Sequence, residues 1–265
     1  MQDKSKSLEV AIKAAQEAGK ILEKYFETEI LKEFKEDASI TTIADKESEE
    51  LIKKIILENF PEHSILGEET GMTGEQSDYV WHVDPLDGTR NYSNGIPLFA
   101  VSIALAYKRE LIVGVIHNPN LNTLFYAEKG KGAYWNDKKI HVSKDEAKKG
   151  IVTVASGKMP AHKELRRNLM HYLPDNVVSA VRDFGCTAFD LAYVARGSTE
   201  ADIKFGLSSY DFAAGLLLVS EAGGKITKVD GSPWNLSETS YVASNGVFHD
   251  LLVEEIKRQK EILKI

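Results

Sequence analysis

Two aspartates, Asp84 and Asp87, stand three positions apart in the stretch WHVDPLDGT, directly after an apolar lead-in. Val80, Trp81 and Val83 predict a buried strand, so Asp84 is expected where that strand leaves the core. Because Pro and Asp-Gly are also ordinary turn chemistry, a plain turn is an alternative for the stretch taken alone. A carboxylate at the end of a buried strand needs a hydrogen-bond donor or a cation as its partner. The nature of that partner indicates what the site can do chemically.

A second acid pair, Glu68 and Glu69, follows the short apolar segment SILG. If the two strands are neighbours, three or four carboxylates converge, and they cannot all stay ionised unless cations lie among them. Mg²⁺ prefers carboxylate and carbonyl oxygens and shares its remaining coordination positions with phosphate. The sequence therefore predicts a hard divalent cation at this site and a phosphate group on the substrate.

Gly88 and Thr89 follow Asp87 and extend this prediction. A glycine permits close approach of the backbone, and exposed N–H groups at a turn or helix start bind an anion. The same loop is therefore expected to hold both metal and phosphate.

Several other chemistries have no signature in the chain. The sequence contains no G-x-x-x-x-G-K-[ST], G-x-G-x-x-G, G-x-S-x-G or H-E-x-x-H motif, and its seven histidines lack ligand spacing. The stretch DPLDGT does not fit an EF-hand, because Leu86 and Gly88 occupy positions where oxygen ligands are needed. Cys186 is the only cysteine, which excludes an intrachain disulfide and a thiolate metal cluster and fits a reducing cytoplasm.

Composition points to a small-molecule partner. The 265 residues are 43% hydrophobic and 28% charged, with a net charge of -7, and the basic residues are scattered among acids. This distribution argues against a nucleic-acid surface. No run approaches the ~20 apolar residues of a membrane span, and the N-terminus lacks the continuous apolar core of a secretion signal.

Hydrophobic periodicity predicts one helix over residues 8–25 and a second between Asp45 and Pro61. Alternating β-branched residues predict strands of an antiparallel meander near residues 64–66, 79–84, 99–107, 110–117 and 122–127. From about residue 148 helices and strands alternate, up to a closing helix from about residue 246. We therefore predict an α+β half (1–147) with most metal ligands and an α/β half (148–265), with the active site between them.

The segments GEE, WHVDPLDGTRNYSNGIPLFAVSIAL and SYDFAAGLLLVSEAGG resemble the inositol monophosphatase family of Mg²⁺-dependent, lithium-sensitive phosphatases. The resemblance spans nearly the entire chain, with Tyr210 where the second motif usually has Trp. It implies a layered α-β-α-β-α sandwich, usually assembled as a homodimer.

The resemblance also implies a set of metal ligands. Glu68, Asp84 and the Leu86 carbonyl would bind a first Mg²⁺, and Asp84, Asp87 and Asp211 would share a second. Glu68 would also contact a third, weakly held ion, so two or three ions are expected in each site. Taken alone, Asp211 reads as an N-terminal cap of the apolar helix that follows it.

By the same resemblance, Thr89 would orient the attacking water within a hydrogen-bond network of Glu69, Asp45 and Thr42. The backbone N–H groups of Gly88 and Thr89 would hold the phosphate, close to Asp87 and Asp211. Asp45 has an alternative role as a cap of the second helix.

The stretch RDFGCTAFD matches the segment that contacts the alcohol part of the substrate, through the backbone of Gly185, Cys186 and Thr187. Cys186 is also expected to serve as a small packing residue. At Lys204, inositol-preferring relatives usually carry Glu, and a lysine cannot accept hydrogen bonds from ring hydroxyls. A cation there favours a substrate with a second anionic group, or else points to solvent.

The expected substrate is inositol 1-phosphate or a related small polyol or sugar phosphate, with fructose 1,6-bisphosphate close behind. Histidinol phosphate and 3'-phosphoadenosine phosphates are further alternatives. A regulatory binding protein of the same fold is the non-enzymatic alternative, and it predicts loss of the metal-binding acids. None of these acids is lost here.

Overall fold

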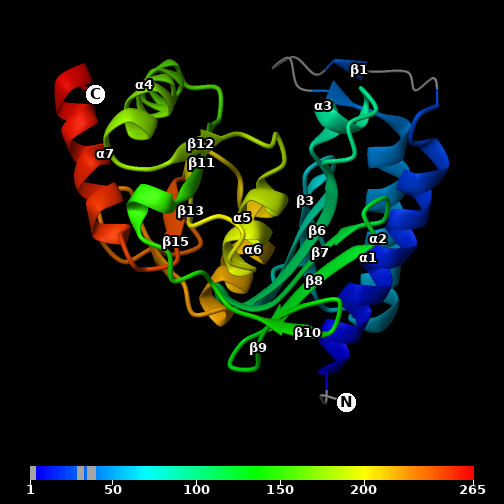
Figure 1. Cartoon of the computed structure of the whole chain (residues 1–265). Helices are drawn as coiled ribbons and strands as arrows, with labels where there is room; N and C mark the ends of the chain where they lie inside the picture. Colours follow the sequence, from blue (N-terminus) through cyan, green and yellow to red (C-terminus); the bar gives the residue numbers. More distant parts are fainter. Residues whose placement is uncertain (1–3, 29–32, 35–39) are drawn as a thin grey trace.

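The computed structural model describes residues 4–28, 33–34 and 40–265. An eight-stranded sheet dominates the first half of the chain (Figure 1). Its strands, in spatial order, are β10 (Lys138–Ile140), β9 (Gly132–Trp135), β8 (Thr123–Glu128), β7 (Glu110–Asn118), β6 (Ala100–Tyr107), β5 (Tyr79–Asp87), β3 (Ser64–Gly67) and β4 (Gly71–Thr73).

The meander predicted from β5 to β8 is confirmed, but the pairing of β3 with β5 is parallel. The prediction of an antiparallel arrangement is therefore wrong for this pair. Gly67 lies opposite Val83, and the Glu68 N–H donates to the Val83 carbonyl oxygen at 3.1 Å. Since parallel strands end at the same edge, the residues that follow β3 and β5 are brought together.

Helices α1 (Lys6–Tyr25) and α2 (Ile43–Asn59) cover one face of this sheet (Figure 1). The predicted apolar stripe of α1 is buried, and its alanines let the helix lie close to α2 and the sheet. Short elements lie near the end of these helices, β1 (Glu33–Phe34), β2 (Ile40–Thr41) and α3 (Thr89–Tyr92).

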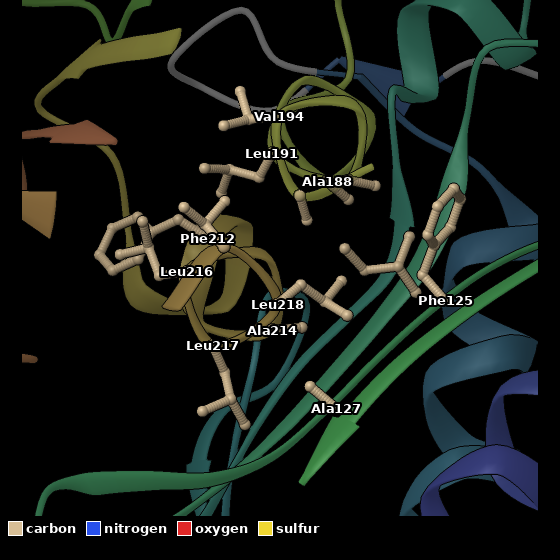
Figure 2. Packing of buried hydrophobic residues seen from close by; sticks show 14 of the residues in the cluster. Phe125, Ala127, Ala188, Leu191, Val194, Phe212, Ala214, Leu216, Leu217 and Leu218 are labelled. Atoms are coloured by element: carbon tan, nitrogen blue, oxygen red, sulfur yellow. The ribbon is translucent and has the colours of Figure 1, made fainter. Parts of the chain in front are cut away.

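Helices α5 (Thr187–Ala195) and α6 (Ser209–Glu221) form the middle layer. Figure 2 shows their apolar side chains meeting those of β8 in one core. Gly114 lets α6 approach β7, because a Cβ at this position would lie 2.7 Å from the Ala214 carbonyl oxygen.

The second sheet has five strands, in the order β12 (Ala180–Arg182), β11 (Ile151–Ser156), β13 (Ala201–Phe205), β15 (Tyr241–Ser244) and β14 (Lys225–Thr227). The first three are parallel, and β15 is antiparallel to β13 and β14. Helices α4 (Pro160–Asn176) and α7 (His249–Leu263) pack on its outer face, and a 3-10 turn (Ala147–Lys149) precedes β11.

The order of layers is thus helices, sheet, helices, sheet, helices, and the predicted layered α-β-α-β-α sandwich is confirmed (Figure 1). The division at residues 147 and 148 stays a prediction. Among the described helices, none combines the length and apolar character that crossing a membrane requires.

Candidate active site

Asp45 enters the site from the first turn of α2. The Thr42 N–H and hydroxyl donate to Asp45 Oδ2 at 2.7 and 2.6 Å, which forms a capping box. Burial raises the pKa of the Asp45 carboxyl to about 7, although the hydrogen bonds from Thr42 oppose this rise. Asp45 therefore caps the helix and also presents its second oxygen to the neighbouring loop.

Thr89 is the residue that Asp45 meets in that loop. Its Oγ1 lies 3.2 Å from Asp45 Oδ1 and 3.0 Å from the Leu86 carbonyl oxygen. Because a hydroxyl carries one proton, Thr89 donates to one of these acceptors at a time. The predicted grouping of Thr42, Asp45 and Thr89 is thus present as a chain of hydrogen bonds.

Gly88 precedes Thr89 and has a left-handed backbone with φ of 87°. A Cβ here would lie 2.8 Å from the Leu98 carbonyl oxygen and 3.2 Å from Cys186 Cβ. Only glycine accommodates both the conformation and the close approach. The turn is therefore pressed against the segment that leads into α5.

Asp84 and Asp87 are both on β5, and the pairing of β5 with β6 shifts between them. Asp84 lies opposite Ser102 and Asp87 opposite Ala100, so three steps along β5 match two along β6. Residues three apart in a regular strand point to opposite faces, and the extra residue of a bulge removes this opposition. The sequence signal for the bulge is Pro85, a residue found within sheets mainly at bulges and edges.

Asp84 is almost completely buried, and its Oδ1 accepts the Leu86 N–H at 3.0 Å. Burial raises the pKa of the Asp84 carboxyl well above its ordinary value, and the carboxylates of Glu68 and Asp87 raise it further. The strand ends three residues later than predicted, at Asp87, so Asp84 lies inside β5 and not where the strand leaves the core.

Asp87 accepts hydrogen bonds from the beginning of α5. Its Oδ2 lies 2.5 Å from the Ala188 N and 3.3 Å from Cys186 Sγ. Burial raises the pKa of the Asp87 carboxyl to about 6, whereas the N–H of Ala188 and the thiol of Cys186 favour its ionised form. The predicted segment of Gly185, Cys186 and Thr187 therefore adjoins Asp87, and the buried Cys186 is more than a packing residue.

Asp211 lies on the first turn of α6, near Asp84 and Asp87. Its Oδ2 accepts the Ser208 N–H at 2.8 Å, in a capping box like that of α2. Burial raises the pKa of the Asp211 carboxyl well above its ordinary value, and the charge of Asp87 adds to the rise. Capping and a place in the site are thus compatible for both Asp45 and Asp211.

We refer to Glu68, Asp84, Asp87 and Asp211 as the acid cluster. The buried Asp84, the half-buried Asp87 and Asp211, and the Leu86 carbonyl offer oxygen acceptors of the kind that a hard divalent cation prefers. In residues 4–28, 33–34 and 40–265, no three His, Cys, Asp or Glu side chains already stand as a complete metal site. The fit to a cation therefore rests on donor type, burial and mutual repulsion.

Two supporting residues were missed by the sequence analysis. Glu49, buried in α2, accepts the N–H groups of Glu69 and Thr70 at 2.8 and 3.0 Å and so holds the turn after β3. Its signal was its position four residues after Asp45, on the same helix face. Asn91 Nδ2 donates to the carbonyl oxygens of Leu98 and Phe184, both at 2.7 Å, and ties α3 to the segment before α5.

Lys204 requires a correction. Its side chain is 0% exposed, so the prediction that it points to solvent is wrong. Its Nζ lies 2.6 Å from Asp190 Oδ2 and 2.5 Å from Asp202 Oδ1, so the ammonium is already paired with two carboxylates. The expectation that Lys204 offers its charge to a second phosphate is therefore also corrected.

Comparison with known proteins identifies the family of the chain. Residues 3–261 match the profile described as Inositol monophosphatase family. A fructose-1,6-bisphosphatase/inositol-1-monophosphatase of Aquifex aeolicus is 38% identical, over 99% of each chain. A protein of Pasteurella multocida named Nus factor SuhB is 36% identical, over 89% of this chain and 90% of its own.

Among solved structures, the extragenic suppressor protein SuhB of Bartonella henselae superposes with a TM-score of 0.88 and 34% identity. The match covers 96% of this chain and 99% of that one. The chain therefore belongs to the inositol monophosphatase family, whose members are generally metal-dependent phosphatases.

Proposed function

We propose that this protein is a Mg²⁺-dependent phosphomonoesterase that acts on inositol 1-phosphate or a related small polyol or sugar phosphate. The observation that carries the proposal is the acid cluster, in which the pKa values of Asp84, Asp87 and Asp211 are raised by burial and repulsion. Acids in this state gain from a bound cation. The adjoining turn at Gly88 fits a phosphate.

In this proposal Glu68, Asp84, the Leu86 carbonyl, Asp87 and Asp211 hold two or three Mg²⁺ ions. When bound, the ions supply charge that polarises the phosphoryl group, stabilises the leaving alkoxide and lowers the pKa of a water molecule. Inhibition by Li⁺ belongs to the same proposal, through competition at a weak Mg²⁺ position.

The protein's own groups position the reactants. Thr89 Oγ1, 3.2 Å from Asp45 Oδ1, donates its proton there and keeps its lone pairs for a hydrogen bond from the attacking water. Asp45 is itself fixed by Thr42, and Glu69 completes this network. The backbone N–H groups of Gly88 and Thr89 hold phosphate oxygens.

The alcohol part of the substrate is assigned to the backbone of Gly185, Cys186 and Thr187. This placement is supported by the contact of Cys186 Sγ and Ala188 N with Asp87, which brings the beginning of α5 beside the acid cluster. A helix beginning also offers N–H groups to hydroxyl oxygens. Fructose 1,6-bisphosphate stays an alternative, without support from Lys204.

A homodimer in the cytoplasm completes the proposal, on the family resemblance and the single buried cysteine. The regulatory alternative is favoured by one observation, the name Nus factor carried by the Pasteurella multocida relative. Retention of every acid of the proposed site supports the enzyme first.

The test is phosphate release with Mg²⁺ from inositol 1-phosphate, fructose 1,6-bisphosphate, histidinol phosphate and 3'-phosphoadenosine 5'-phosphate. We expect turnover of inositol 1-phosphate or the sugar phosphate, and none after removal of Mg²⁺ by EDTA. Absence of turnover for every substrate in a folded, Mg²⁺-loaded preparation would overturn the enzymatic proposal and leave the regulatory one.

A further inference from the structure

Glu49 is a buried carboxylate outside the acid cluster. It lies on α2 one helical turn after Asp45, so the two acids share a face of the helix. Its Oε2 accepts the Glu69 N–H at 2.8 Å, and its Oε1 accepts the Thr70 N–H at 3.0 Å and the Thr70 hydroxyl at 2.5 Å. All of these donors belong to residues 68–70, which we call the glutamate turn.

The fit between Glu49 and the end of β3 is close. Gly67 is the last residue of this strand, and a Cβ there would lie 2.5 Å from Glu49 Oε1 and 2.7 Å from Oε2. Since a methyl group cannot approach so closely, glycine at this position lets the carboxylate lie against the strand. Lys53 Nζ donates to the Thr70 hydroxyl at 3.1 Å, which leaves the hydroxyl proton for Glu49.

The side chain at position 49 must accept hydrogen bonds with both of its terminal atoms. A carboxylate does so, because it carries two acceptor oxygens and no donor. A glutamine has the same shape, but its NH₂ group would face an N–H group of the turn. Glutamate is therefore matched to the donors of the glutamate turn in charge as well as in length.

The glutamate turn carries two residues of the proposed site, and Glu68 is held on both sides. Its own N–H donates to the Val83 carbonyl oxygen at 3.1 Å, and the next N–H, of Glu69, donates to Glu49. The peptide groups before and after the Glu68 Cα are thus fixed, one by β5 and the other by α2. After burial, the charge of Glu68 is the largest cause that raises the pKa of Asp84, so its side chain lies near the acid cluster.

Helix α2 fixes a second loop of the site as well. Asp45 Oδ1 lies 3.2 Å from Thr89 Oγ1, in the turn after β5, while Glu49 holds the turn after β3. Figure 1 shows α2 in the outer layer that covers the sheet containing both strands. Two carboxylates one helical turn apart therefore set the position of one loop relative to the other.

We propose that Glu49 is a positioning residue of the metal site, which holds the glutamate turn so that Glu68 joins the acid cluster as a ligand. The inference rests on the proposed phosphatase function and adds a residue that acts through the backbone of its neighbours. A partner that orients a metal ligand contributes to metal affinity, because the ligand is already in place when the cation binds.

The test measures Mg²⁺ binding to the metal-free, full-length protein by calorimetric titration, together with phosphate release from inositol 1-phosphate. Glu49→Gln replaces one acceptor oxygen by a donor and keeps the length of the side chain. We expect the Kd for Mg²⁺ to rise about ten- to hundredfold, the usual effect of losing a group that orients a ligand. At saturating Mg²⁺, KM should change less than about twofold, since no substrate contact is removed.

Thr70→Val is a milder variant of the same contact, at an exposed position where folding is not at risk. It removes the hydroxyl donor to Glu49 and keeps the backbone N–H. The Kd for Mg²⁺ should rise about two- to tenfold, as expected for one hydrogen bond. Thr70→Ser restores the donor and should return the Kd to the wild-type value.

Two variants on α2 are the matched controls. Glu50→Gln makes the same chemical change at an exposed neighbour and should leave Mg²⁺ binding and turnover unchanged. Ile52→Val, in the core between α2 and the sheet, should lower the melting temperature without changing the Kd. A rise in Kd for Ile52→Val equal to that for Glu49→Gln would show a general effect of stability and overturn the inference. An unchanged Kd in Thr70→Val, or in folded Glu49→Gln, would overturn it as well.

The two readouts separate this inference from the proposed function. Phosphate release by the wild type, with one Kd for Mg²⁺ in every variant, rejects the role of Glu49 and leaves the phosphatase intact. Mg²⁺ binding that Glu49→Gln weakens, without phosphate release by the wild type, rejects the phosphatase and supports Glu49 as a positioning residue of the metal site. A wild-type protein that binds no Mg²⁺ rejects both.

Discussion

Two groups of acids adjoin α5, and they are neutralised in different ways. Asp87 of the first group accepts the Ala188 N–H at the start of the helix, and Asp190 of the second lies on the helix itself. In the first, the acid cluster, burial and mutual repulsion raise the pKa values of Asp84 and Asp211. The second consists of Asp190, Asp202, Lys204 and Tyr241, and we call it the ion-paired cluster.

In the ion-paired cluster burial also raises the pKa of Asp190, to about 8, but every acid meets a donor from the chain itself. Lys204 Nζ bridges Asp190 and Asp202, and the Tyr241 hydroxyl donates to Asp202 Oδ2 at 2.8 Å. Burial lowers the pKa of Lys204, but the two carboxylates outweigh burial and raise it above its ordinary value. Buried acids with a permanent counter-ion serve structure, whereas acids left with one another are suited to a cation from solution.

The largest expected effect breaks the acid cluster. Asp87→Asn should lower turnover roughly a thousandfold or more, because it removes a negative charge that holds the metal. The melting temperature should stay equal or rise, since an amide oxygen can still accept the Ala188 N–H and one repulsive charge is gone. Phosphate release measures the turnover, and thermal melting of the metal-free protein measures the stability. Near wild-type turnover would remove Asp87 from the metal site.

The corresponding change in the ion-paired cluster should act on stability instead. Lys204→Met leaves Asp190 and Asp202 buried without their cation, which should lower the free energy of unfolding by about 3–5 kcal/mol. Urea unfolding measures this loss. Adding Asp190→Asn and Asp202→Asn to the same chain should recover much of it. A stable Lys204→Met protein with altered substrate preference would return Lys204 to the substrate site.

A third prediction concerns the effect of added Mg²⁺, which should bind the acid cluster and not the ion-paired cluster. Mg²⁺ should raise the melting temperature of the wild-type protein by about 2–8 °C at saturating concentration, because it binds the folded state. The same addition should have little effect on Asp87→Asn. If both proteins gain equally, the stabilising ion binds outside the acid cluster.

The acid cluster also shows which features of the site the sequence predicted and which it did not. Asp84 and Asp87 stand in a local pattern of apolar residues and turn residues, and Glu68 follows an apolar segment, so their position at or near the ends of β5 and β3 was readable. The parallel pairing of β3 with β5 was not, because it depends on the chain direction after a long connection. The bulge between Asp84 and Asp87 depends on pairing with β6, and Pro85 was its local signal.

Lys204 shows why single residues inside strands are harder to predict. The resemblance assigned it by position, and a lysine in an apolar strand gave no sign of its partner fourteen residues earlier, Asp190. Its other partner was readable, since Asp202 and Lys204 are two apart and lie on the same face of β13. A D-x-K pair in a completely buried strand predicts an internal ion pair as readily as a substrate contact.

The smallest expected effect concerns Asp45, at the edge of the acid cluster. Burial, with a contribution from the charges of Glu69 and Glu68, raises the pKa of Asp45 to about 7, from an ordinary 3.8. The folded metal-free protein therefore keeps a proton that the unfolded chain loses, so stability should fall as pH rises from about 4 to about 7.

Asp45→Asn should flatten this dependence by about 1–3 kcal/mol between pH 4 and pH 8, measured by urea unfolding in EDTA. His249 provides an internal control of sign, because burial lowers its pKa to about 4 and its contribution makes stability rise between pH 4 and 6.5. His249→Gln should steepen the fall that Asp45→Asn flattens. Equal pH slopes in wild type and Asp45→Asn would show that Asp45 is ionised in the folded protein, with a cation or donor closer to it than Thr89.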